Sequence, residues 1–181
     1  GDLNNAFFGA VTNRGQDDVA IMQDFMTYAA DELMPRGVWV MGHGFVEANT
    51  GVDAAHDAFL TNNLGVSLRD PDYYALSGTI VAFPDLIPTS VVNNAGAIYS
   101  VQNSCLYTMD VLDVNAGLAG ATVASTYQNL GAAGPYTSGV YVPSSSSHPY
   151  VTLTDGWDMF NMFNRHGASS VGRLYYFMDV L

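Results

Sequence analysis

The sequence contains no lysine, and five arginines are its only strongly basic residues, against seventeen aspartates and glutamates. The formal net charge is −12 and the sequence pI is about 4.2. Such a chain repels the phosphates of nucleic acids and anionic membrane surfaces, which excludes nucleic acid as a partner. Its remaining polar residues are mostly uncharged, a mixture common on secreted bacterial surface proteins. We therefore expect a secreted or cell-surface protein.

Cysteine and long apolar runs are also scarce. Because Cys105 is the only cysteine, an internal disulfide and a four-cysteine zinc site are excluded. No apolar run approaches the roughly 20 residues that span a bilayer, which predicts no membrane span. With 181 residues, 49% of them hydrophobic, the chain is long enough to bury a core. We expect one domain over residues 1–181, processed from a larger secreted protein.

The first third of the sequence alternates helix and strand patterns. In residues 16–34, apolar residues recur at helical spacing behind two aspartates that favour a helix amino terminus. Residues 37–41 form a short apolar run typical of a buried strand. Residues 53–65 predict a second helix, with Asp53 as its cap and Gly65 at its end. This order predicts an α/β fold with a parallel sheet.

The rest of the sequence predicts further strands and a helical tail. Strands are expected at residues 74–83, 96–102, 121–127, 138–142 and 150–154, and two helices in the tail after them. Together these elements predict a three-layer α/β domain, in which helices flank a parallel or mostly parallel sheet. Because the sequence opens as though a strand had just ended, we expect the sheet to lack its first strand. An exposed sheet edge would then invite pairing with a neighbouring chain.

Residues 37–48, GVWVMGHGFVEA, contain the candidate site on which the interpretation of the protein's function depends. The apolar run breaks into Gly-His-Gly and then into a helix start. This pattern places His43 at the carboxyl end of a strand, where α/β folds build their sites.

Seven segments carry a resemblance to a known family. In order along the chain they are GDLN, DDVAIMQDFM, RGVWVMGHGF, FLTNNLGV, NSCLYTMDVLDV, ATVASTYQN and DGWDMFNMFNRHGASSVGRLYYFMDVL. Together they resemble a class I glutamine-amidotransferase-like domain, in the degenerate form embedded in large secreted multidomain bacterial proteins. The resemblance implies a flavodoxin-like fold. Active members carry a cysteine nucleophile in a Gly-x-Cys-x-Gly turn, and the matching position here is His43. Because histidine cannot form the thioester, the resemblance implies the fold without the activity.

A cysteine hydrolase is the alternative reading. His-Gly closing one strand and Ser-Cys closing a later one is the layout of caspase-like and gingipain-like cysteine peptidases. In this reading Cys105 is the nucleophile and His43 is the base. The two readings differ in whether Cys105 lies beside His43.

Metal ligands are the remaining chemical candidates. Asp110, Asp113 and Asn115 could bridge an extracellular Ca²⁺, although they match no EF-hand loop and a solvated acidic loop is the more frequent origin of such spacing. A second set would converge if the second helix packed over the turn, namely His43, Glu47, Asp53 and His56. No phosphate-binding loop is present, so we expect no nucleotide cofactor.

Tyrosines set among serine, glycine and proline are typical of adaptable contact surfaces. The leading hypothesis is therefore a non-catalytic structural or binding module of a secreted bacterial protein, with self-assembly as its extension. Its expected partners are other domains of the parent protein, other copies of itself, or a carbohydrate or protein ligand.

Overall fold

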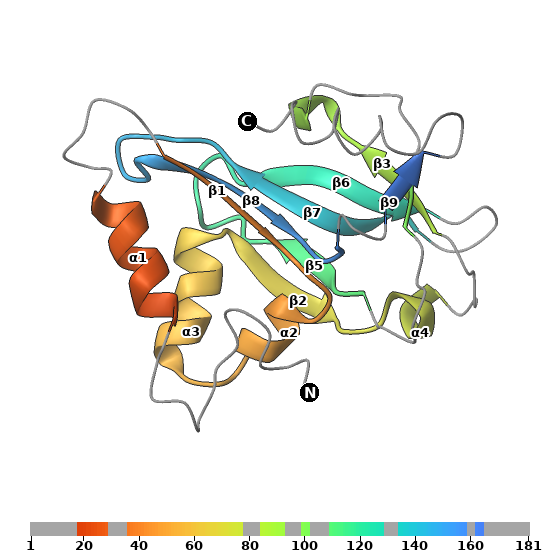
Figure 1. Ribbon diagram of the computed structural model, residues 1–181, viewed down its shortest axis with the longest axis horizontal. Coiled ribbons are helices and arrows are strands. Elements are labelled where there is room, and N and C mark those ends of the chain that lie inside the picture. Colours follow the sequence, from red (N-terminus) through yellow and green to blue (C-terminus); the bar gives the residue numbers. More distant parts are fainter. Residues whose placement is uncertain are drawn as a thin grey trace.

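The structure, a computed structural model, describes residues 18–28, 36–77, 84–92, 99–101, 109–128, 134–158 and 162–164. Within these ranges the chain is built mainly of strands, which form a seven-stranded and a two-stranded sheet (Figure 1). The helices are short, and none in the described ranges is long and apolar enough to cross a membrane.

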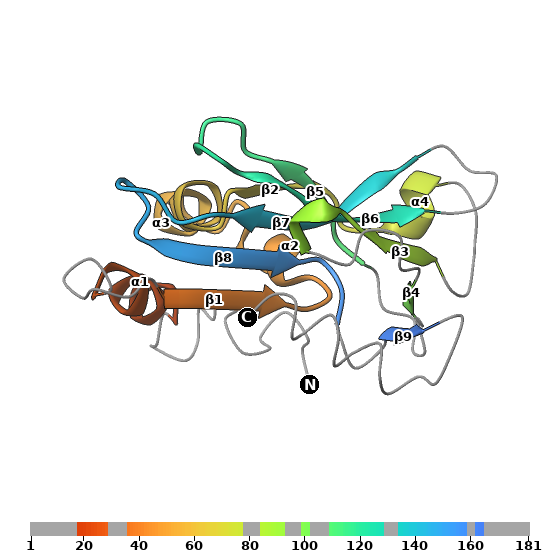
Figure 2. The ribbon, with the colours of Figure 1, turned by 90° about the horizontal axis from the view of Figure 1, so that it is seen from above.

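The large sheet has the strand order β1-β8-β7-β6-β3-β4-β9. Its strands are β1 (Arg36–Met41), β3 (Asp85–Pro88), β4 (Tyr99–Val101), β6 (Thr122–Gln128), β7 (Tyr136–Val142), β8 (Tyr150–Asp155) and β9 (Met162–Asn164). The small sheet pairs β2 (Val66–Asp70) with β5 (Val111–Val114), and β5 packs against β7 (Figure 2).

The helices in the described ranges lie mostly in the first half of the chain. They are α1 (Asp18–Tyr28), α2 (Phe45–Asn49), α3 (Ala54–Ala58), which continues as the π-helix η3 (Phe59–Asn63), α4 (Tyr73–Ser77) and the 3₁₀ turn η4 (Ser90–Val92).

The prediction of a three-layer α/β domain with a parallel sheet is wrong. Only β1 and β8 run parallel, and every other strand pair in the described residues is antiparallel. The physical reason lies in the connections, because neighbouring antiparallel strands need only a short link whereas parallel strands need a long crossover. β6, β7 and β8 follow one another through short turn-rich links and pair in sequence order.

Individual elements were predicted with mixed success. The helix in residues 16–34, the strand in residues 37–41 and the helix in residues 53–65 are confirmed where the structure describes them. The predicted strand at residues 74–83 is wrong in its described part, since Tyr73–Ser77 forms α4. The helix begins there because Asp72 accepts a hydrogen bond from the Tyr74 N–H at 2.9 Å, a local turn that competes with strand pairing.

Other strands were missed. β2 and β5 were not predicted, β3 falls in a segment read as a turn, and β9 falls in the tail read as helical. The rest of the predicted tail helices lies outside the described residues.

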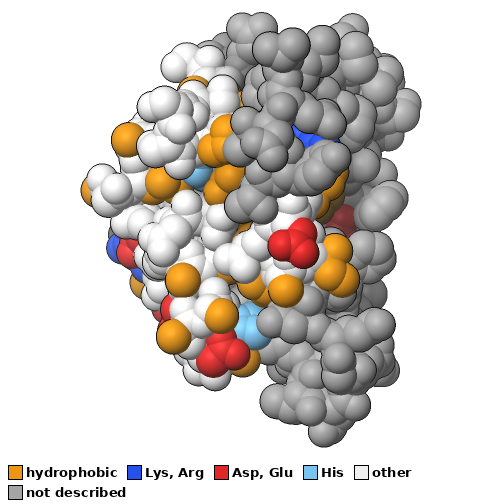
Figure 3. All heavy atoms as spheres, turned by 90° about the vertical axis from the view of Figure 1, so that its left-hand side faces the viewer, with side chains coloured by type: hydrophobic (Ala, Val, Ile, Leu, Met, Phe, Trp, Pro, Cys, Tyr) orange, Lys and Arg blue, Asp and Glu red, His pale blue; other side chains and the backbone are white. Residues whose placement is uncertain are grey.

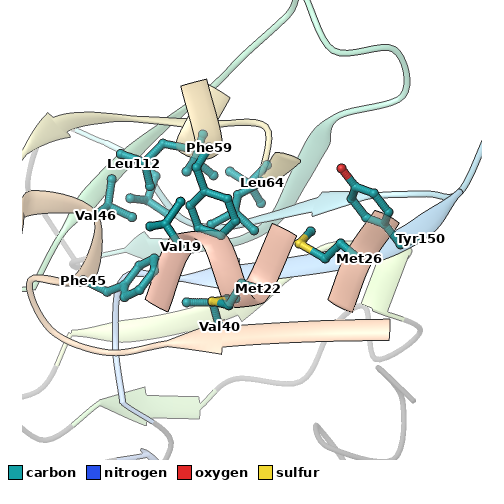
Figure 4. Close-up of a cluster of buried hydrophobic side chains, with 13 residues drawn as sticks. Val19, Met22, Met26, Val40, Phe45, Val46, Phe59, Leu64, Leu112 and Tyr150 are labelled. Carbon is teal, nitrogen blue, oxygen red and sulfur yellow. The ribbon is translucent and has the colours of Figure 1, made fainter. Parts of the chain in front are cut away.

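In the described residues the core consists of two clusters, and β1 contributes side chains to both. Side chains alternate across a strand, so Val40 and Trp39 point to opposite faces. Val40 belongs to the cluster beneath α1, where Val19, Met22 and Met26 come from the buried stripe of the helix (Figure 4). Trp39 packs against the second cluster, which is rich in aromatic residues.

Gly139 on β7 leaves room for two polar side chains on its neighbours. It is paired with Ser125 of β6 on one side and Asp155 of β8 on the other. A Cβ at Gly139 would collide with Asp155 Oδ1 and Ser125 Oγ. Asp155 is held in place because its Oδ2 accepts a hydrogen bond from Trp39 Nε1 at 2.7 Å. Glycine is therefore required at this position.

We predict that Gly139→Ala lowers the free energy of unfolding by about 1–3 kcal/mol, the usual effect of adding a carbon to a packed site. The control is Gly37→Ala on β1, where an added Cβ meets nothing within 4 Å. Urea denaturation of both variants measures the difference. Equal stability of the two variants would show that the space above Gly139 is not filled as described.

Candidate functional site at the turn after strand β1

The candidate site lies where the two parallel strands end together. Met41, the last residue of β1, is paired with Asp155, the last residue of β8, and the Gly42 N–H donates to Asp155 O at 3.3 Å. After β1 the chain turns through His43, and Gly44 adopts a left-handed conformation with φ of 70° before α2 begins. The predicted strand, Gly-His-Gly turn and helix start are confirmed.

Asp110, just before β5, ties this turn to the rest of the molecule. Its Oδ2 accepts hydrogen bonds from the N–H groups of Val46 at 3.0 Å and Glu47 at 3.3 Å, in the first turn of α2. The Asp110 N–H donates to Gly156 O at 3.1 Å. A Cβ at Gly156 would collide with the Asp110 backbone, so the two segments are in close contact. Asp110 thus joins α2, β5 and the turn after β8.

Burial controls the charge of Asp110. The side chain is 0% exposed, and burial raises its pKa to about 7. The nearby Glu47 carboxylate raises the pKa further, whereas the N–H groups of Glu47 and Val46 oppose the increase. Within the described residues, Asp110 Oδ1 has no hydrogen-bond partner. Burial also raises the pKa of Tyr127 well above its usual value, with the carboxylates of Asp110 and Asp155 adding to the effect.

His43 lies in the turn itself and is partly buried. Burial lowers its pKa, and the carboxylate of Asp158 partly opposes that shift. The imidazole is therefore mainly neutral at neutral pH, the state in which a histidine accepts a proton.

The hydrolase dyad stays a prediction, because Cys105 lies outside the described residues. The structure places only its proposed base, His43, at the end of the parallel strand pair.

The proposed calcium ligands are not brought together. Asp110 is buried beneath α2, whereas Asp113 is exposed on β5. The side-chain amide of Asn115 is hydrogen-bonded within the protein. Its Nδ2 donates to Thr61 O at 2.8 Å, and its Oδ1 accepts from the Gly117 N–H at 3.1 Å. The spacing suggested a shared site, but Asp110 is enclosed where it bonds to α2, whereas Asp113 faces the solvent.

In the second proposed metal set, the proximity of Asp53 and His56 is explained by the cap of a helix. Asp53 caps α3 as predicted, accepting hydrogen bonds from the N–H groups of Ala55 and His56, each at 2.9 Å. The same Oδ1 lies 2.8 Å from His56 Nδ1. No group of three or more histidine, cysteine, aspartate or glutamate side chains suited to a metal occurs in the part of the chain that the structure describes.

Comparisons with known proteins add no further information. No protein-family model, curated protein or solved structure matches this chain. The chemistry of the turn therefore rests on its own contacts.

Sequence reasoning missed the two contacts that organise this site. Asp110 bonds to residues 64 and 63 positions earlier in the chain, and Asp155 bonds to Trp39 across 116 positions. One local signal was available for Asp110, which stands between Met109 and Val111 in an apolar segment. An acidic residue in such a position is buried only with partners.

We predict that Asp110→Asn changes how stability depends on pH. In the folded protein Asp110 keeps its proton up to about pH 7, whereas the unfolded chain releases it near the ordinary value of 3.8. Wild-type stability therefore falls as pH rises from about 4 to about 7, by an amount on the order of a few kcal/mol. The neutral amide can still accept the α2 hydrogen bonds, and the variant lacks this fall.

Denaturant unfolding at several pH values measures this effect. Asp113→Asn, an exposed position on β5, is the matched control. If the stability difference between wild type and Asp110→Asn is constant from pH 4 to pH 7, Asp110 is not held in the protonated form.

Proposed function

We propose that this protein is a non-catalytic structural or binding module of a secreted or cell-surface bacterial protein. The observation that carries the proposal is the enclosure of the acidic groups where the parallel strands end. Asp110 and Asp155 are both 0% exposed, and both accept hydrogen bonds from inside the molecule. A carboxylate in acid–base catalysis must instead reach a substrate proton.

The composition of the surface supports a contact role. In the described part of the face shown in Figure 3, hydrophobic side chains (orange) are scattered among white atoms of other side chains and the backbone, and charged groups are few. Loop 143–149 contributes the exposed serines of residues 144–147 to this surface. Such mixtures suit adaptable protein or carbohydrate contacts. The partners we propose are other domains of the parent protein, other copies of this chain, or a protein or carbohydrate ligand.

A cysteine hydrolase is the second candidate, favoured by one observation. His43 occupies the turn at the carboxyl end of β1, and burial lowers its pKa, so the imidazole is ready to act as a base. The nucleophile of this alternative would be Cys105. A histidine beside a catalytic cysteine holds the thiol as a thiolate, which lowers the cysteine pKa from about 8.5 to roughly 3.5–7.5.

The rate of Cys105 alkylation by iodoacetamide distinguishes the two functions. We expect the folded protein either to resist alkylation or to react as an ordinary thiol, with a rate that rises above about pH 8. His43→Ala should leave this profile unchanged, because the proposed module has no thiolate–imidazole pair. Cys105→Ser is the blank for labelling elsewhere. A thiol that reacts rapidly at pH 6 in the wild type and loses this reactivity in His43→Ala would contradict the non-catalytic proposal.

A further inference from the structure

Loop 143–149, between β7 and β8, holds a buried histidine. The loop is closed by a backbone bridge, in which the Ser145 N–H donates to His148 O at 2.7 Å and the His148 N–H donates to Ser145 O at 3.1 Å. Residues 144–147 are exposed, whereas His148 is only 2% exposed. The titratable side chain of this loop therefore lies inside the protein while its serines face the solvent.

The His148 ring packs against Tyr150 and so is linked to two helices. The two ring centroids are 3.9 Å apart. The Tyr150 hydroxyl accepts a hydrogen bond from Asn63 Nδ2 at 2.6 Å, and Asn63 Oδ1 accepts one from Gln23 Nε2 at 3.2 Å. Tyr150 also shares the core cluster with Met26 of α1 (Figure 4). The position of His148 is thus coupled to η3 and α1.

The surroundings of His148 favour its neutral form. Within the described residues, Nε2 has no hydrogen-bond partner, and burial lowers the pKa of His148 with no acidic group opposing the shift. From β8 the facing group is Tyr150, whose pKa burial raises, and the uncharged Asn63 of η3 donates to the hydroxyl of that tyrosine.

On β1, the residue paired with Tyr150 is the charged Arg36. Its guanidinium lies 4.7 Å from the centre of the Phe25 ring. A proton added to His148 would therefore create a buried cation with no negative partner among these groups, which is strongly unfavourable.

We propose that loop 143–149 is an acid-sensitive latch, in which protonation of His148 moves the imidazole away from Tyr150 and opens the loop while the sheet stays folded. The direction follows from linkage, because an exposed histidine in the open loop takes up a proton near pH 6.5 whereas the buried one does so only at lower pH. The closed loop is fully stabilised above about pH 6.5, and this stabilisation is lost as the pH falls.

The opened latch would present a different contact surface. Release of His148 exposes the Tyr150 ring beside the serines of residues 144–147, which changes the polar and aromatic surface at this end of the sheet. The latch goes beyond the function proposed above, because it involves neither Asp110 nor Asp155, the enclosed groups that carry that proposal.

NMR spectroscopy of the full chain between about pH 7.5 and about pH 4.5 tests the latch, with His148→Phe as the decisive variant. Phenylalanine keeps the ring contact with Tyr150 but cannot be protonated. In the wild type we expect the Tyr150 ring shifts to change, and the protection of the Ser145 and His148 amide protons to fall at least tenfold, as His148 titrates. In His148→Phe the Tyr150 shifts and the Ser145 protection should persist over the same range.

His56→Gln is the matched control, because His56 is also buried but lies 2.8 Å from Asp53, and this variant should open as the wild type does. The latch would be overturned by protection of Ser145 that is unchanged while His148 titrates, or by loop opening in His148→Phe at the same pH as in the wild type. If His148→Phe does not fold, the wild-type titration decides. A His148 midpoint at or above about 6.5 would contradict the latch.

Discussion

The hydrogen bonds from Val46 and Glu47 to the Asp110 carboxyl group are the interaction on which the arrangement of this protein depends. α2 has only five residues and cannot form a stable helix alone, so its first turn needs a partner from elsewhere in the chain. Asp110 supplies that partner, and its own backbone is fixed by Gly156 after β8. One side chain thereby joins the turn after β1, the small sheet and the end of β8.

This junction explains why the acidic groups near the Gly-His-Gly turn are enclosed. The two parallel strands bring their carboxyl ends together, as in many enzymes, but the carboxylates there are directed inward. Asp110 accepts from α2 and Asp155 accepts from the Trp39 indole. Asp155 therefore links β8 to β1, and Asp110 links the segment before β5 to α2. His43 remains in the turn as a mainly neutral side chain.

The elements that depend on neighbouring residues could be predicted from the sequence, whereas the pairing of distant strands could not. The apolar stripe of α1, the strand before His43 and the Asp53 cap of α3 each follow from neighbouring residues, and each is confirmed. The parallel sheet was inferred from the order of elements in the first third of the chain. That order does not determine how β6, β7 and β8 pair, and their short connections make them antiparallel.

The same limit applies to the site. The position of His43 at a strand end was predictable from twelve consecutive residues, 37–48. The role of Asp110 was not, because its partners lie more than sixty positions away and nothing near it in the sequence points to α2. The spacing of Asp110, Asp113 and Asn115 suggested a calcium site, whereas Asp110 is buried against α2 and Asp113 is exposed on β5.

Hydrogen exchange of the Val46 and Glu47 amide protons tests the central claim most directly, because these are the protons that Asp110 is said to hold in an enclosed junction. If the junction is closed, both amides exchange orders of magnitude more slowly than in an unstructured peptide, and only when α2 opens. Exchange of both amides at the rate of an unstructured peptide in the folded protein would show an open turn, and would contradict the account.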